Sequence, residues 1–116
     1  MNINALVNLI RSSRIDLSSE KRAQADLEAL LVAANVAYER EVRLSDGDII
    51  DFLIDGIGIE VKTRAASKKD IFRQLTRYAK HPRIDVLILV GCISMGLPTQ
   101  IEGKDAYFVK LGEGWL

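Results

Sequence analysis

Residues 49–63 read IIDFLIDGIGIEVKT, and this stretch decides the fold. Two short apolar runs flank the dipeptide Asp55-Gly56, which is a strong signal for a two-residue β-hairpin turn. The segment therefore predicts two antiparallel strands, at residues 49–54 and 57–63.

Pairing across this turn brings three polar side chains to one face of the sheet. Counted back from the turn, Asp51 stands opposite Glu60 and shares a face with Ile49 and Leu53, while alternation places Lys62 beside Glu60. Two opposed carboxylates in apolar strands repel each other and are costly to bury. A hard cation such as Mg²⁺ would offset that cost, and Lys62 would then hold a water or stabilise charge on a phosphate. The alternative is an ion pair of Lys62 with Glu60 or Asp51 at a sheet edge, which contributes little.

Periodicity in the rest of the chain predicts helices and strands in alternation. We expect helices at residues 3–11, from Ser18 or Ser19 to about Val36, and at 67–79, and further strands at 38–44, 85–90 and 106–111. This order predicts a mixed sheet flanked by helices. The stretch from Glu60 to Val90 is long enough to connect two parallel strands through a helix. The side chains of the 67–79 helix that we expect to face inward are Ile71, Phe72, Leu75, Tyr78 and Ala79.

Length and composition limit the class of protein. The 116 residues suit one domain, residues 1–116, and a single cysteine and a single histidine exclude a disulfide framework and a four-side-chain zinc site. We see neither a signal peptide nor an apolar run of about 18–20 residues, the length that crosses a membrane. We therefore expect a cytoplasmic protein with no membrane partner.

The formal net charge of zero hides an uneven distribution. Residues 62–83 contain eight basic residues and one acid, so this segment carries +7 and the remainder −7. A basic segment of this kind is typical of a phosphate-binding face, and the alternative is a solvated helix face. The side chains that we expect to contact DNA phosphates, or merely to aid solubility, are Arg64, Lys68, Lys69, Arg73 and Arg77.

An acid on one strand followed by Glu-x-Lys on the next, here Asp51 and Glu60-Val61-Lys62, resembles the core of the PD-(D/E)XK nuclease superfamily. Ile50 stands where that pattern has proline. The resemblance covers residues 18–90 and implies a restriction-endonuclease-like three-layer fold, with α-β-β-β-α-β order at its heart. It implies that Asp51, Glu60 and the Val61 carbonyl bind Mg²⁺ or Mn²⁺, and that Lys62 positions or activates the water that hydrolyses a phosphodiester.

Many members of this superfamily add a glutamate from the helix before the strands, and Glu20 is the candidate for this catalytic residue. It falls on the helical stripe of Ala23, Leu27 and Leu31. The alternative is an acid favoured at a helix N-terminus by the helix dipole. Glu28 lies off this stripe, and we expect it to be exposed to solvent.

Gln74-x-x-x-Tyr78 resembles the Gln-x-x-x-Tyr motif of RecB-like nucleases in the same superfamily. A spacing of four places both side chains on one helical face, from which they would reach DNA or the water at the site. The alternative is that Tyr78 packs in the core and Gln74 caps a sheet edge.

The leading hypothesis is a metal-dependent DNA endonuclease. In length the chain is similar to minimal VRR-Nuc-type proteins and Holliday-junction resolvases, which implies branched, flapped or otherwise structured DNA and a possible homodimer. No sequence-reading element is evident, so we expect recognition of structure or backbone. Two alternatives are a non-catalytic nucleic-acid-binding or scaffold module on the same fold, and an unrelated interaction domain whose acidic pair is accidental.

Overall fold

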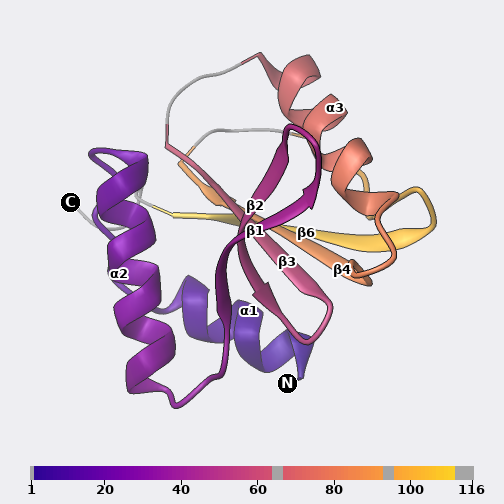
Figure 1. Ribbon diagram of the computed structural model, residues 1–116. Helices are drawn as coiled ribbons and strands as arrows, with labels where there is room; N and C mark the ends of the chain where they lie inside the picture. The colour runs from indigo at the N-terminus through magenta and orange to yellow at the C-terminus, as the bar shows by residue number, and fades with distance from the viewer. Residues whose placement is uncertain (1, 64–66, 93–95, 112–116) are drawn as a thin grey trace.

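The computed structural model describes residues 2–63, 67–92 and 96–111 (Figure 1). These residues form three helices: α1 Ile3–Arg11, α2 Glu20–Ala33 and α3 Lys68–Ala79. The six strands of the described part are β1 Glu39–Ser45, β2 Asp48–Ile54, β3 Ile57–Lys62, β4 Val86–Gly91, β5 Gln100–Ile101 and β6 Lys104–Lys110. The predicted succession of helices and strands is confirmed, and β5 is an additional short strand in a segment without a strand signal.

The strands form one mixed sheet in the order β1-β2-β3-β4-β6-β5. Strands β3, β4 and β6 run parallel, whereas β1 with β2, β2 with β3, and β5 with β6 are antiparallel. Helices α1 and α2 cover one face of the sheet, and α3 covers the other (Figure 1). The prediction that a helix connects two parallel strands is confirmed by α3, which lies between β3 and β4.

Each face of the sheet has its own hydrophobic core. On the α3 face, the buried residues of the helix are Ile71, Leu75, Tyr78 and Ala79. Phe72 was expected among them, but its side chain is 39% exposed. Each helical residue is turned by about 100° from the one before it, so Phe72 lies beyond the edge of the stripe that Ile71 and Leu75 define.

The ends of α2 follow from two polar residues. The Ser19 hydroxyl accepts a hydrogen bond from the Arg22 N–H at 3.1 Å, as the predicted cap requires. The helix ends at Ala33, before the expected end at Val36, because Asn35 adopts a left-handed conformation with φ of 59°. Asparagine tolerates this conformation better than most residues, and the Val36 N–H then returns to the Leu31 carbonyl at 2.9 Å.

The hairpin of β2 and β3 has the predicted two-residue turn. Asp55 and Gly56 both have positive φ, 45° and 80°, as a type I′ turn demands. The paired residues are Ile54 with Ile57, Leu53 with Gly58, and Phe52 with Ile59. The register predicted from the sequence is therefore confirmed for these three pairs.

The ladder between β2 and β3 ends at Phe52 and Ile59, although β2 begins four residues earlier and β3 continues to Lys62. We call the fork the place beyond Phe52 and Ile59, away from the turn, where β2 and β3 are no longer paired. At the same level β1 bends, because Glu41 has a left-handed φ of 48°. The open end of the β1–β2 hairpin, at Tyr38 and Phe52, packs toward α2. The end that holds the turn, at Leu44 and Ile50, packs toward α3 (Figure 1).

This bend changes which side chains share a face. Alternation predicted that Asp51 lies with Ile49 and Leu53, and that prediction is wrong. Ile50 joins Leu53 in the core beneath α3, while Ile49 is 42% exposed. The regular alternation of β2 is interrupted at Asp51, which therefore sits at a break in the strand.

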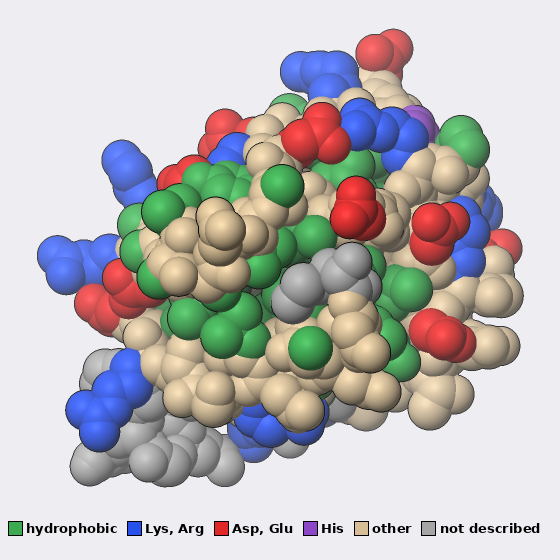
Figure 2. All heavy atoms as spheres, turned by 90° about the horizontal axis from the view of Figure 1, so that it is seen from below, with side chains coloured by type: hydrophobic (Ala, Val, Ile, Leu, Met, Phe, Trp, Pro, Cys, Tyr) green, Lys and Arg blue, Asp and Glu red, His purple; other side chains and the backbone are tan. Residues whose placement is uncertain are grey.

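The end of the molecule opposite the fork is seen in Figure 2. Apolar side chains form patches across the middle of this view, and lysines and arginines lie mainly at its margins. Among the described residues, no helix combines the length and the apolar character needed to cross a bilayer.

Candidate active site at the fork of β2 and β3

Asp51 is held at the fork by a hydrogen bond from the neighbouring strand. Its Oδ2 accepts the backbone N–H of Val61 at 2.8 Å. The carboxylate thus takes a main-chain donor at the level where the β2–β3 ladder has ended. Asp51 is half-buried. The sequence predicted a directly opposed pair of Asp51 and Glu60; in the structure Asp51 reaches β3 through its side chain.

Glu60 is the most deeply buried acid of the site, with 3% of the residue exposed. Its Oε2 lies 3.1 Å from the Lys62 Nζ. Its Oε1 is buried and has no hydrogen-bond partner within the described part of the chain. A buried oxygen without a partner costs about 1–3 kcal/mol. Native structures keep few such atoms, so this one needs an explanation.

Both carboxylates of the fork are harder to ionise than usual. Burial, followed by the negative charge of Asp51, raises the pKa of Glu60 from its usual 4.5 to about 8, while Lys62 opposes the change. Burial also raises the pKa of Asp51, against the hydrogen bond from Val61 and the charge of Lys62. A bound cation would favour the charged form of both groups.

Lys62 forms one of the two ion pairs that we considered from the sequence, the pair with Glu60. Its side chain is only 18% exposed, and β3 lies between β2 and β4, so this is not a sheet-edge pair. Exposed ion pairs contribute little, but a half-buried amine beside a buried acid is held in place. Lys62 also borders a pocket beneath α3, described below.

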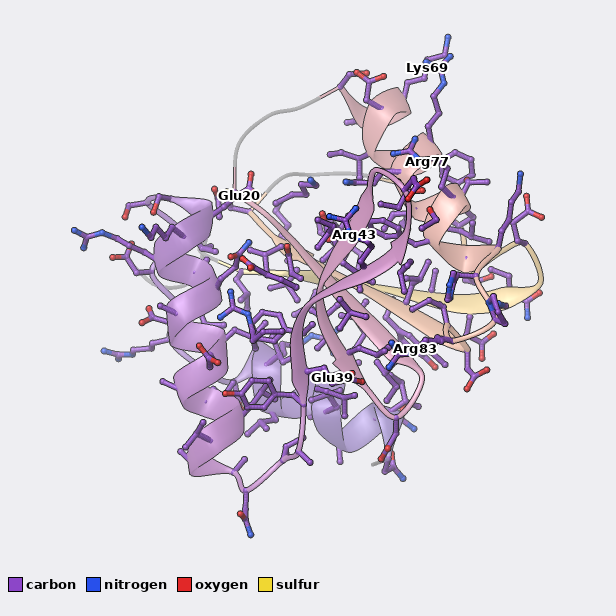
Figure 3. All side chains as sticks on the ribbon, in the orientation of Figure 1. Glu20, Glu39, Arg43, Lys69, Arg77 and Arg83 are labelled. Carbon is purple, nitrogen blue, oxygen red and sulfur yellow. The ribbon has the colours of Figure 1, made fainter. Side chains whose placement is uncertain are left out.

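Glu20 is the first residue of α2, at the end of that helix nearest the end of β3 (Figure 3). Its negative charge contributes to raising the pKa of Asp51, so the two carboxylates interact. It is half-buried and also occupies the first helical turn, where the helix dipole favours an acid. Glu20 therefore lies within electrostatic range of Asp51, and its catalytic role stays a prediction.

Arg40 is a residue of this region that sequence reasoning did not identify. Its Nη1 lies 2.9 Å from Glu28 Oε1 and its Nη2 lies 3.3 Å from Gln24 Oε1. Its guanidinium stacks over the Phe52 ring at 4.6 Å. Its positive charge lowers the pKa of Asp51. The available signal was the spacing of Gln24 and Glu28, four residues apart and therefore neighbours on the surface of one helix.

Glu28 is not the solvent-exposed residue that we expected. Its Oε2 accepts a hydrogen bond from the Tyr38 hydroxyl at 2.6 Å, and its other oxygen binds Arg40. We call Gln24, Glu28, Tyr38 and Arg40 the Arg40 cluster. It joins α2 to β1 and β2 on the side of the fork opposite α3.

The two residues of the Gln-x-x-x-Tyr motif have different environments. Tyr78 is 1% exposed and donates its hydroxyl to the Ile49 carbonyl at 2.9 Å, so the alternative of a core residue describes it, not contact with DNA. Burial, followed by the charges of Glu60 and Asp51, raises the pKa of this hydroxyl. Gln74 is half-buried and lines the pocket beside Lys62 instead of capping a sheet edge.

The predicted DNA-binding cations fall into two groups. Arg73 and Arg77 line the pocket with Lys62, and Arg77 Nε also lies 2.9 Å from Asp48 Oδ1. Lys68 and Lys69 are exposed on α3 outside the pocket lining, and Lys69 points away into solvent (Figure 3). The prediction for Arg64 falls outside the described residues.

Asp51 and Glu60 offer carboxylate oxygens, the type of ligand that a hard cation prefers, but two carboxylates do not complete its coordination. Within residues 2–63, 67–92 and 96–111, no group of three or more His, Cys, Asp or Glu side chains is arranged to hold a metal ion. Asp51 and Glu60 would therefore contribute two carboxylates, with the Val61 carbonyl and water completing the ligands. Mg²⁺ commonly binds proteins through one or two carboxylates and keeps several waters. The unpartnered Glu60 Oε1 fits this role.

Comparison of the chain with protein-family models, curated proteins and solved structures finds no match in any of the three. The site has four features that bear on its chemistry. These are two carboxylates with raised pKa values, a half-buried amine, and a cationic pocket next to that amine.

Proposed function

We propose that this chain is a metal-dependent nuclease that hydrolyses DNA phosphodiester bonds on a restriction-endonuclease-like fold. One observation carries the proposal. Asp51 and Glu60 lie together at the fork, with a buried Glu60 oxygen that has no hydrogen-bond partner among the described residues and with the Lys62 amine 3.1 Å from the other oxygen. Perturbed acids with a specific charge partner are typical of functional sites.

The arrangement of elements supports the same proposal. From α2 to β4 the chain runs α-β-β-β-α-β, the order implied by the PD-(D/E)XK resemblance. The two acids and the lysine lie on β2 and β3, as that pattern requires. The sheet with helices on both faces is compatible with the three-layer fold that we expected.

The roles follow from position. Asp51, Glu60 and the Val61 carbonyl would hold Mg²⁺ or Mn²⁺, which when bound would stabilise negative charge on the attacking and leaving oxygens. Lys62 would donate a hydrogen bond to the attacking water or to the developing charge on the phosphate. Glu20 would supply a further acceptor that orients this water.

The substrate is expected to be recognised through its backbone. The cations of α3 and β3 that line the pocket would contact phosphates, which position a nucleic acid without reading its bases. Structured DNA, such as a junction or a flap, is therefore the substrate class that we propose.

The test is cleavage of junctions, flaps, single strands and duplexes in Mn²⁺ by the wild type, Lys62→Ala and Asp51→Asn. We expect the wild type to cleave at least one substrate and both variants to lose that activity, with their folds verified by thermal melting. Cleavage that is equally fast in both variants, or absent from the wild type, would overturn the proposal.

A second candidate is a non-catalytic nucleic-acid-binding module on the same fold. The ion pair between Lys62 and Glu60 favours it, because it already partners one carboxylate oxygen without a metal. This module would bind DNA with strong salt dependence and would not respond to Mn²⁺. A melting temperature that rises with Mn²⁺ in the wild type but not in Asp51→Asn would favour the nuclease.

A further inference from the structure

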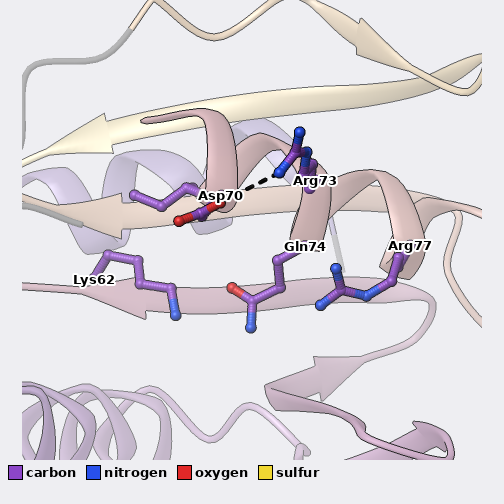
Figure 4. A pocket seen from close by; sticks show the side chains of 6 residues that line it. Lys62, Asp70, Arg73, Gln74 and Arg77 are labelled. Atoms are coloured by element: carbon purple, nitrogen blue, oxygen red, sulfur yellow. Dashed lines mark ion pairs between the residues drawn. The ribbon is translucent and has the colours of Figure 1, made fainter. Parts of the chain in front are cut away.

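A pocket of about 420 Å³ opens between α3 and the end of β3 (Figure 4). Its lining residues are Lys62, Asp70, Ile71, Arg73, Gln74 and Arg77. The five helical members are related by spacings of three and four residues (70 to 73 and 74, 71 to 74, 73 and 74 to 77), so they belong to one side of α3. Lys62 contributes from β3, which makes the pocket a neighbour of the acidic pair at the fork.

The lining of this pocket is positively charged. It contains three cations and one acid, Asp70, whose Oδ1 lies 3.7 Å from Arg73 Nη1 with both side chains largely exposed. A pair of this kind is weak and easily exchanged. The acids that partner the other two cations, Glu60 and Asp48, are not lining residues, and their side chains are only 4% and 14% exposed. A ligand in the pocket therefore meets the cations first.

The donors of the pocket suit a phosphate group. Arg77 uses Nε for Asp48, and Figure 4 shows the end of its guanidinium turned toward Gln74. The Lys62 ammonium and the Gln74 amide project to the same side. Arginine binds phosphate through paired N–H donors, and lysine adds a point charge.

We propose that this pocket binds the phosphate monoester at the end of a nucleic-acid strand. A terminal monoester carries about −1.5 to −2 at neutral pH, against one charge for each internal phosphate, so three cations favour the monoester. The volume lies within the roughly 300–1,000 Å³ of small-ligand pockets, which suits one terminal nucleotide. Binding of the phosphorylated end does not depend on the proposed nuclease function. A role of the bound end in directing cleavage does rest on that function, because Lys62 borders both sites.

The test measures binding without catalysis. Fluorescent single-stranded oligonucleotides of one sequence, with a 5′-phosphate, a 3′-phosphate or only hydroxyl ends, are titrated with the wild type in EDTA and followed by anisotropy. We expect one phosphorylated end to bind at least about tenfold more tightly than the hydroxyl form. The two phosphorylated oligonucleotides identify which end the pocket takes. Equal affinity for all three would overturn the proposal.

Variants connect the preference to the pocket. Arg73→Gln combined with Gln74→Leu should remove the preference for phosphorylated ends, while Lys21→Gln, an exposed lysine of α2, should retain it. If the double variant melts early, Arg73→Gln alone serves, because that side chain is 61% exposed. A preference that survives in variants whose melting is normal would place the monoester elsewhere and contradict the assignment.

The outcome is separable from that of the proposed function. Asp51→Asn should abolish cleavage and keep the end preference, since Asp51 is not a lining residue. A wild type that binds phosphorylated ends but never cleaves would retain the pocket and lose the nuclease. A wild type that cleaves all three oligonucleotides equally well and binds them equally well would retain the nuclease and lose the pocket.

Discussion

Two polar clusters flank the fork, and they differ in how fully their carboxylates are paired. In the Arg40 cluster, one oxygen of Glu28 accepts from Tyr38 and the other binds Arg40. On the α3 side, one Glu60 oxygen pairs with Lys62, and the other is buried with no hydrogen-bond partner in the part of the chain that the structure describes. A paired carboxylate stabilises the fold, whereas an unpaired buried oxygen opposes it. Similar residue types thus have opposite energetic consequences on the two sides of the fork.

The surroundings of the two cations differ as well. The Arg40 guanidinium is stacked on Phe52 and tied to α2, although its Nε is also buried without a hydrogen-bond partner in the described structure. Lys62 instead borders an open cationic pocket. We infer that the Arg40 cluster fastens α2 to the strands near Asp51, and that the Glu60–Lys62 side is where a ligand acts.

The largest effect is expected from Asp51→Asn, which keeps a side-chain oxygen to accept the Val61 N–H. Cleavage in Mn²⁺ should fall by about 10²–10⁴-fold if this carboxylate is part of the catalytic machinery. Stability should hold or rise, because one of two repelling acids is neutralised. Glu28→Gln is the comparison variant. It should be less stable than the wild type, but its cleavage rate should fall by less than about tenfold, which corresponds to about 1.4 kcal/mol of activation free energy. Equal losses of rate in both variants would remove the distinction between the clusters.

The next effect is a pH dependence of stability. The pKa of Glu60 is about 8 in the folded chain and near 4.5 when exposed. The folded state therefore binds a proton that the unfolded state releases between these values. Stability is full below about pH 4.5 and should fall by on the order of a few kcal/mol as pH rises through about 8.

Urea unfolding in EDTA from pH 5 to pH 8 measures this slope, with Glu60→Gln as the comparison. The variant cannot ionise at position 60, so its stability should fall less steeply with pH; the part that remains comes from groups such as Asp51, whose pKa is also raised by burial. Added Mn²⁺ should offset the loss in the wild type at the upper end, because a cation binds the charged acids. A wild type that becomes more stable as pH rises would contradict the raised pKa of Glu60.

A smaller effect is expected from the Arg40 cluster. Arg40→Met removes the bonds to Glu28 and Gln24 and leaves the Glu28 carboxylate with Tyr38 alone. We expect a loss of about 1–3 kcal/mol in unfolding free energy. Arg43→Met is the matched control, since Arg43 is an exposed arginine on the same strand (Figure 3) and should change stability by less than about 0.5 kcal/mol. Equal losses in both would show that the cluster adds nothing beyond a surface charge.

The smallest effect concerns Tyr78. Tyr78→Phe removes one buried hydrogen bond, to the Ile49 carbonyl, and should cost about 1 kcal/mol. Because Tyr78 is buried, its loss should leave DNA affinity unchanged, whereas Gln74→Leu should weaken binding. A fall in affinity for Tyr78→Phe at unchanged stability would restore the expectation that this side chain contacts DNA.

The sequence alone was enough for the hairpin and for the described helices and strands other than the two-residue strand β5. Period-2 and period-3.6 patterns are local properties, and the Asp55-Gly56 dipeptide selects a turn whose length sets the register. The residue types of the candidate site could be read for the same reason, because a charge in an apolar strand is conspicuous wherever that strand packs.

Only the tertiary structure decided how those residues meet. The bend at Glu41 and the end of the ladder at Phe52 arise because the β1–β2 hairpin packs on α2 at one end and on α3 at the other. That competition interrupts alternation at Asp51 and lets Tyr38 and Arg40 pair with Glu28, whereas one oxygen of Glu60 has no partner within residues 2–63, 67–92 and 96–111. Alternation describes one strand, whereas pairing of buried polar groups depends on every element packed around them.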